Sequence, residues 1–270
     1  MILEFHFWGV RGSIPVSKTT HSYFGGHTSC LEIRTKELQI FLDTGTGFQN
    51  TELQKNTPTI ILFSHFHHDH IQGLLFGNGT FQLSDDVFIS SALCSPSELK
   101  STLSRYFGGP LFPVEIDQIL NKVNFVEFEA LNNLFSESIN LSNLSLNHPG
   151  GCAGYRIDAA EGSITSLVDN EVYPAQLTAL NQFADGSDLV IWDAMFTEDE
   201  LELHQGWGHS SIDAGSQLPT DANIKSLDLS QHPPKRSEME LQRMNDLKLT
   251  DKCFWAREHP KLLLEVDKIK

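Results

Sequence analysis

A run of imidazoles and one carboxylate follows an apolar segment in the first quarter of this 270-residue chain. The apolar segment spans 59–63, and the run contains His65, His67, His68, Asp69 and His70. Imidazole nitrogens and carboxylate oxygens are ligands of zinc, manganese and iron ions in proteins. His65 and His67 project from the same side of an extended segment, and a turn can direct Asp69 and His70 to a second ion. We therefore predict two divalent metal ions (zinc, manganese or iron) as cofactors, with His68 at the surface.

Four side chains cannot complete two metal sites, so more distant ligands are expected. Candidates are His148, Asp169 and His232. Each follows a predicted strand directly, where loops build functional sites on a rigid frame. Their shared position after a strand, rather than any one residue alone, indicates metal ligands.

Short apolar or alternating runs bounded by turn residues predict many strands and fewer helices. Strands are expected at 2–8, 30–35, 38–43, 59–63, 123–128, 140–147, 153–158, 163–168 and 224–230, with an apolar run at 188–194. Helices are expected after Ser95 or Ser97, at 174–182, from about 210, and at 236–248. This order predicts a layered α/β or α+β sandwich that forms a single domain over 1–270.

Composition and charge restrict the partners. The net charge is -16, and such a surface repels a phosphate backbone, which argues against long nucleic acid as a partner. No apolar run is long enough to cross a bilayer, so no membrane partner is expected. The four cysteines are scattered, which favours free thiols and a cytoplasmic location. We expect a small-molecule substrate; the oligomeric state stays open, with a homodimer as one alternative.

Together these segments resemble the metallo-β-lactamase superfamily. The likeness begins at FWGVRGSIPVS, continues through FGGHTSC, FLDTGTG and the histidine run, and extends to about residue 241. The resemblance implies a four-layer αββα sandwich with its metals at one edge of two sheets. It also implies that one metal is held by His65, His67 and His148, the second by Asp69 and His70, and that Asp169 bridges them. Asp69 would then be needed for catalysis.

The resemblance also favours one reaction. Metal pairs of this kind activate a bridging water for attack on lactams, thioesters or phosphodiesters, so the fold alone does not choose among them. The bridging residue here is an aspartate, where many lactamases carry a cysteine. The segment GWGHSS over 206–211 resembles the GHST segment of tRNA 3′-processing enzymes and cyclic phosphodiesterases. By that likeness His209 is catalytic and protonates or stabilises the leaving oxygen. In the alternative interpretation His209 only contacts the start of a helix that Ser210 or Ser211 caps.

The expected function is therefore a metal-dependent hydrolase, a phosphodiesterase for a small phosphodiester such as a cyclic nucleotide or phosphoribosyl cyclic phosphate. The segments GVRGSIPVS and FGGHTSC most resemble the phosphoribosyl cyclic phosphate diesterases, which usually carry Asn where this chain has His27. One alternative is a thioesterase of the glyoxalase II type, and another is a degenerate sensor that binds metal or ligand without turnover. Asp43 is expected to orient a metal histidine or to form a turn. Asp193 lines the site or is structural.

The last metal position has two candidates. Counting forward from GHSS, the family's final ligand falls on Gln231 rather than on His232. Neighbouring residues of an extended segment face opposite sides, so both cannot reach the metal from a regular strand. Because imidazole is the commoner ligand, we expect His232 at the second metal after a small shift of the loop, with Gln231 as the alternative.

Overall fold

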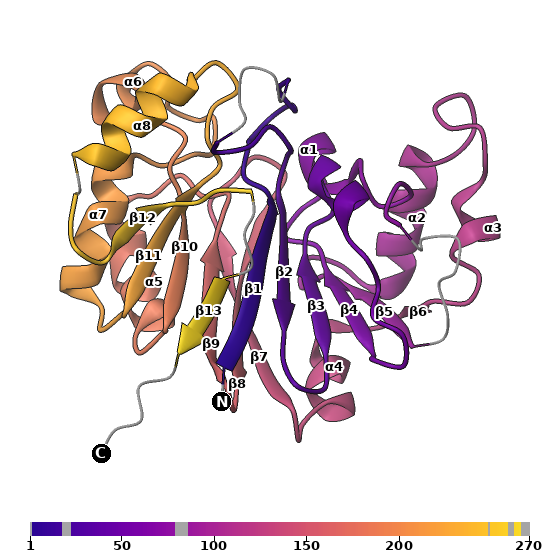
Figure 1. The fold of residues 1–270 in the computed structure, drawn as a ribbon. Helices are drawn as coiled ribbons and strands as arrows, with labels where there is room; N and C mark the ends of the chain where they lie inside the picture. Colours follow the sequence, from indigo (N-terminus) through magenta and orange to yellow (C-terminus); the bar gives the residue numbers. More distant parts are fainter. Residues whose placement is uncertain (1, 18–22, 79–85, 248, 259–261, 266–270) are drawn as a thin grey trace.

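The computed structural model describes residues 2–17, 23–78, 86–247, 249–258 and 262–265, which form two facing sheets with helices outside them (Figure 1). The first sheet contains, in spatial order, β13 (Leu262–Glu265), β1 (Ile2–Gly9), β2 (Cys30–Arg34), β3 (Gln39–Leu42), β4 (Thr59–Leu62), β5 (Val87–Ser90) and β6 (Asn124–Phe125). The second contains β12 (Cys253–Trp255), β11 (Ser226–Ser230), β10 (Leu189–Asp193), β9 (Gly162–Leu167), β8 (Cys152–Ala159) and β7 (Ile139–Leu146).

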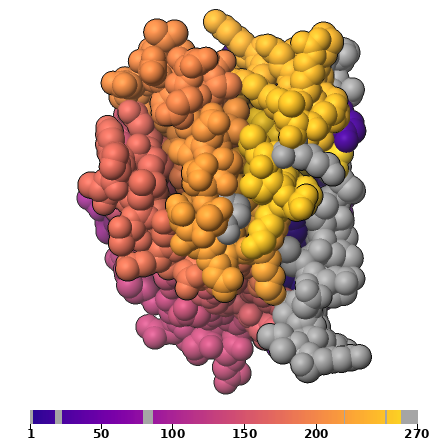
Figure 2. All heavy atoms as spheres, turned by 90° about the vertical axis from the view of Figure 1, so that its left-hand side faces the viewer, coloured from indigo at the N-terminus to yellow at the C-terminus, as the bar shows by residue number. Residues whose placement is uncertain are grey.

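Helices cover the outer face of each sheet (Figure 1). Beside the first sheet lie α1 (His68–Ile71), α2 (Pro96–Tyr106) and α3 (Ile116–Ile119). Beside the second lie α5 (Leu177–Ala184), α6 (Glu198–Glu202), α7 (Ile212–Asp221) and α8 (Glu238–Asp246), while α4 (Phe128–Leu134) lies near the opposite end of the sheets from α1. Figure 2 shows the face that α7 and α8 cover, in orange and yellow. The predicted four-layer αββα sandwich is confirmed.

Three apolar cores hold these layers together. Along β4 the side chains alternate, with Ile60 and Leu62 packed between the sheets and Ile61 packed against the outer helices. Because both faces of such a strand are buried, its sequence is continuously apolar. Leu99 of α2 packs in the same outer core as Ile61, and Leu241 of α8 packs in the equivalent core of the second sheet.

The strand directions gather several loops at one edge. Strands β3, β4 and β5 are parallel, as are β9, β10 and β11, and β7 has the direction of β9 because each is antiparallel to β8. The segments that follow the carboxyl ends of β4, β7, β9 and β11 contain the predicted metal ligands. A shared edge of this kind is a common location for binding sites in α/β sheets.

Several predicted elements differ in detail. Ser95, not Ser97, caps α2, since its side chain accepts from the Glu98 backbone N–H and Glu98 returns a bond to the Ser95 N–H. The predicted strand at 123–128 is wrong beyond the two-residue β6, because Phe128 already begins α4 and packs into the core. The predicted helix at 236–248 spans Glu238–Asp246, and residue 248 lies outside the described residues.

No helix within the described ranges has both the length and the apolar character needed to span a membrane. The four cysteines are free thiols, as expected.

Candidate metal centre

Six of the seven side chains that the sequence marked as metal ligands lie together at the shared edge of the sheets. They come from the segment after β4, from α1, and from the ends of β7 and β9. Three overlapping groups form among the described residues: His65, His67 and His148 in the first, His65, His70 and Asp169 in the second, and His148, Asp169 and His209 in the third. In each group, one ligand atom per residue lies within 4.8 Å of the others. The role of each residue as a ligand stays a prediction.

Asp169 occupies the centre of the arrangement. Its Oδ2 lies 3.8 Å from His65 Nε2, 3.8 Å from His148 Nε2 and 3.5 Å from His70 Nε2. A carboxylate that faces the first two groups at similar distances has the position of a bridging ligand. Asp69 approaches from the other side, with its Oδ2 3.4 Å from His70 Nε2.

The first group offers lone pairs that a cation would use. The Nε2 of His65 is buried and has no hydrogen-bond partner among the described residues. Burial lowers the pKa of His65, His67 and His148, so these rings are neutral at pH 7. Metal binding requires neutral imidazole, and a buried nitrogen without a partner is costly unless a ligand reaches it. These residues therefore fit a divalent ion.

The ring of His70, in the second group, is surrounded by an excess of negative charge. Asp69, Asp169 and Asp43 surround the buried ring of His70. Burial alone would lower the pKa of His70, but the three carboxylates raise it well above its ordinary value. Several buried carboxylates around one imidazole need a positive charge, which a second divalent ion would supply.

Asp43 orients histidines of the first two groups. Its Oδ2 accepts from His70 Nδ1 at 2.8 Å and from Ser64 Oγ at 2.7 Å, and Ser64 Oγ lies 3.0 Å from His65 Nδ1. Fixing the far ring nitrogen in this way directs Nε2 toward a metal. Asp43 also has a left-handed backbone with φ of 60°, so both interpretations from the sequence apply to it.

His148 is oriented by a turn that the sequence did not reveal. Its Nδ1 lies 2.7 Å from the carbonyl oxygen of Gly208, the residue just before His209. The carboxylate of Glu171 accepts from the backbone N–H groups of Gly206 and Gly208 at 2.9 and 2.8 Å. Gly208 has a φ of +84°, and a Cβ there would lie 2.3 Å from His148 Nδ1, so only glycine fits. In the sequence, the signal that could have indicated this turn is the position of Glu171, two residues after Asp169.

The early segment GVRGS also reaches the centre. The backbone N–H of Ser13 donates to Asp69 Oδ2 at 2.7 Å. A charged acceptor bound to a backbone donor is well fixed in place. His27 lies elsewhere, with its Nδ1 3.3 Å from Thr46 Oγ1. His68 is exposed, and its ring contacts the Tyr106 hydroxyl, which agrees with the predicted surface position.

The expectation that His232 reaches the second metal is corrected by the structure. Gln231 points into the centre, with its Nε2 3.0 Å from His70 Nε2 and 2.6 Å from Asp169 Oδ1. His232 faces the other way, where its Nε2 bonds the carbonyl of Ala256 at 2.8 Å and its ring packs beside Trp255. The physical reason is the alternation of neighbouring side chains, which the left-handed backbone of Gln231 (φ of 62°) does not reverse.

Arg11 holds the loop that carries Gln231. The side chain is fully buried, and its guanidinium donates to the carbonyl oxygens of Gly25, Pro233 and Arg236 at 2.8, 3.1 and 3.0 Å. Residues 10 and 12 bond the backbone of His232 on either side. This clamp fixes the segment after β11 against the end of β1, so the loop shift that would bring His232 to the metal is blocked.

His209 lies beside the central carboxylate. Its Nδ1 is 2.7 Å from Asp193 Oδ2 and 3.9 Å from Asp169 Oδ2. Ser211 caps α7 by accepting from the Ala214 N–H, as the alternative interpretation requires, but the His209 ring bonds the Asp193 carboxylate rather than the start of that helix. Burial alone would lower the pKa of His209, but Asp193 and then Asp169 raise it to about 9. Asp193 therefore acts on the site through His209.

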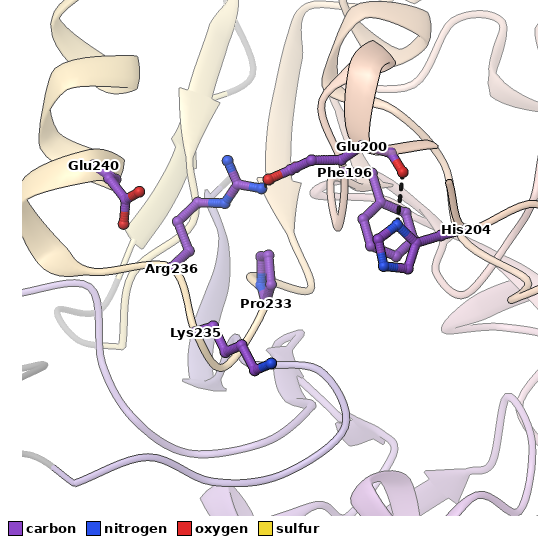
Figure 3. Close-up of a pocket in the computed structure, with 7 residues that line it drawn as sticks. All are labelled: Phe196, Glu200, His204, Pro233, Lys235, Arg236 and Glu240. Atoms are coloured by element: carbon purple, nitrogen blue, oxygen red, sulfur yellow. Dashed lines mark hydrogen bonds and ion pairs between the residues drawn. The ribbon is translucent and has the colours of Figure 1, made fainter. Parts of the chain in front are cut away.

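Phe196 lines a pocket of about 270 Å³ (Figure 3). The centroid of its ring lies 6.0 Å from that of the His209 ring. Phe196 stacks on His204 with ring centroids 4.5 Å apart, and the His204 ring bonds the Glu200 carbonyl. Arg236 reaches across to the Glu200 carboxylate, while Lys235 lies on the lower wall in this view (Figure 3). The lining thus mixes both signs of charge.

Comparison with solved structures gives close matches in fold. A metallo-beta-lactamase fold protein, YhfI from Bacillus subtilis, has a TM-score of 0.70 at 15% identity and covers 96% of this chain and 99% of that chain. Human tRNase Z, short form, has a TM-score of 0.67 at 17% identity and covers 98% and 100%. A diphosphatase from the PhnP family has a TM-score of 0.65 at 16% identity and covers 96% and 97%. At such identities the likeness shows the fold alone.

Comparison with curated proteins gave no match. The family model described as a beta-lactamase superfamily domain matches residues 39–227, which contain the histidine run, His148, Asp169 and His209. With the sandwich fold and the histidine and aspartate cluster at its sheet edge, the chain belongs to the metallo-β-lactamase superfamily.

Proposed function

We propose that this protein is a metal-dependent phosphodiesterase that acts on a small phosphodiester. The observation that carries the proposal is His209, a histidine held by Asp193 beside the central carboxylate. Divalent ions at the centre would supply an activated water and positive charge for the attacked phosphate and the leaving oxygen. The residues of the chain then orient the substrate and manage protons.

His209 fits the task of protonating a leaving alkoxide. With Nδ1 bound to Asp193, Nε2 is the nitrogen that is left to donate a proton. Burial opposes the charged ring, but the adjoining Asp193 carboxylate raises the pKa of His209, which favours the protonated form that a proton donor needs. An alkoxide is strongly basic and needs a proton as it leaves. A thiol has an ordinary pKa of about 8.5, so a thiolate leaves without being protonated. A phosphodiester therefore uses this residue better than a thioester does.

The size of the substrate follows from charge. A net charge of -16 disfavours long nucleic acid, so a cyclic nucleotide or a comparable small diester suits the site better. Two structural neighbours bear the names of phosphate-cleaving enzymes, a tRNase Z and a PhnP-family diphosphatase. They support the proposal only by showing that enzymes so named have this fold.

The experiment is a substrate screen of the zinc- or manganese-loaded protein with bis(p-nitrophenyl) phosphate, a cyclic nucleotide, a glutathione thioester and a lactam. A phosphodiester should turn over fastest, and a chelator should abolish the rate. His209→Ala should lower the rate roughly a hundredfold while metal content is unchanged. His204→Ala is the matched control, since this histidine stacks on Phe196 in the neighbouring pocket. Faster cleavage of the thioester than of every phosphodiester would assign the protein to the thioesterases instead.

Gln231 favours a second candidate, a sensor that binds metal without turnover. An amide in place of an imidazole weakens the second metal position, because imidazole is the better ligand for these ions. A protein that binds two ions yet cleaves none of the tested substrates would support this function. Measurable turnover that is lost in Asp69→Ala would exclude it.

A further inference from the structure

A cavity of about 460 Å³ opens beside α1, apart from the pocket at Phe196. Its walls come from α1 with the turn after it, and from the end of α2 with the loop that follows. Six of the lining residues are His68, Gln72, Phe76, Tyr106, Leu111 and Phe112. The volume lies in the range of small-molecule sites, about 300–1,000 Å³.

The cavity borders α1, the helix that also carries the ligand candidates Asp69 and His70. His68, on its wall, stands between His67 and Asp69 in the chain, and its ring contacts the hydroxyl of Tyr106. A group bound in the cavity would therefore lie against the helical turn that carries Asp69 and His70.

Aromatic rings dominate the lining. Phe76 and Phe112 meet edge to face, with centroids 5.9 Å apart, and Phe112 meets the buried Phe107 in the same way at 5.3 Å. Phe76 is nevertheless 59% exposed and Leu111 is 72% exposed. Exposed apolar side chains that gather at a cavity commonly mark a binding site, because water covers them poorly.

Among the described residues that line the cavity there is no aspartate, glutamate, lysine or arginine. In contrast, the pocket at Phe196 is lined by Lys235, Arg236 and two glutamates. A neutral aromatic cavity on a protein with a net charge of -16 favours a neutral planar group over an ion. We propose that the cavity is a subsite for a nucleobase or a similar neutral ring carried by the phosphodiester substrate. This inference rests on the proposed function.

The test compares two cyclic phosphodiesters that differ only in the ring. Adenosine 2′,3′-cyclic phosphate and methyl riboside 2,3-cyclic phosphate share the same scissile group, so their ratio of kcat/KM isolates the adenine. The wild-type protein should prefer the adenosine ester about tenfold, the effect of one stacked base. Phe76→Ala should remove this preference and leave the methyl riboside unchanged. Leu111→Ala should reduce it in the same direction.

Phe254→Ala is the matched control, because this phenylalanine is 51% exposed on β12 in the second sheet. It should leave both esters unchanged. A Phe76→Ala protein that loses the same factor on both esters, or on neither, would overturn the subsite.

A second measurement separates the subsite from the reaction. Saturation-transfer NMR with adenosine, which carries no phosphate, should show adenine signals for the metal-loaded wild-type protein and none for Phe76→Ala. If no phosphodiester is cleaved but this difference is seen, the proposed function fails and the ring subsite stands. If phosphodiesters are cleaved but adenosine gives no signal and the ester ratio does not change, the subsite fails and the function stands.

Discussion

Replacing Asp43 by Asn should weaken both metal positions, and the second more than the first. The carboxylate accepts from His70 Nδ1 directly at 2.8 Å, but it reaches His65 only through Ser64. A hydrogen bond to a charged group contributes about 1.5–3 kcal/mol, which corresponds to roughly a 10- to 100-fold loss at the second ion. The link through the Ser64 hydroxyl is a neutral hydrogen bond of about 1 kcal/mol, so the first ion should weaken about fivefold.

Asn is the right replacement because it tolerates the left-handed backbone that Asp43 adopts, so the backbone is not perturbed. Calorimetric titration of zinc into the metal-free variant, with a competing chelator, would resolve the two affinities. Ser64→Ala is the control, and it should weaken only the first ion. If Asp43→Asn weakens the first ion as much as the second, or neither ion, then Asp43 does not orient the histidines as we infer.

Three further outcomes are expected. Gln231→His should tighten the second ion by about tenfold or more in the same titration, because imidazole is the better ligand, while His232→Ala should leave both affinities unchanged. Gly208→Ala should loosen the first ion, because its Cβ would lie 2.3 Å from the imidazole that this glycine orients; Gly206→Ala has the same left-handed strain but open space, and should not. Burial raises the pKa of Asp228 to about 7, so ionising it costs the folded state increasingly as pH rises from about 4 to 7. Asp228→Asn should therefore raise the Tm at pH 8, and its free energy of unfolding should increase there by up to about 4 kcal/mol. The difference in Tm between the variant and the wild type should close at pH 4. An equal Tm at pH 8 would show that this carboxyl is not desolvated.

The sequence predicted the location of the centre well, for a physical reason. Each candidate ligand follows a short apolar strand, and parallel strands bring their carboxyl ends to one edge. His148 and Asp169 are therefore close in space although their strands are separated by β8. Strand β5 was missed, because three apolar residues and a serine are too few to distinguish a strand from part of a helix.

The last metal position could not be predicted from the sequence in the same way. Because neighbouring side chains face opposite sides, only one of Gln231 and His232 faces the centre, and which one does so depends on where the turned-away ring can bond. That partner is the carbonyl of Ala256, which follows β12, a strand that the sequence did not indicate. The Gly208 carbonyl that orients His148 was missed for the same reason, since a contact across 60 residues has no local pattern.

The clamp at Arg11 has a consequence for synthesis of the chain. Its bonds to Pro233 and Arg236 join residues that are 222 and 225 positions apart. During translation, the first 148 residues contain all three histidines of the first metal group, whereas Gln231 emerges much later. Contacts of such long range form late, because a long loop must close first. A ribosome-bound chain therefore carries every histidine of the first group well before Arg11 can fix the loop that completes the second.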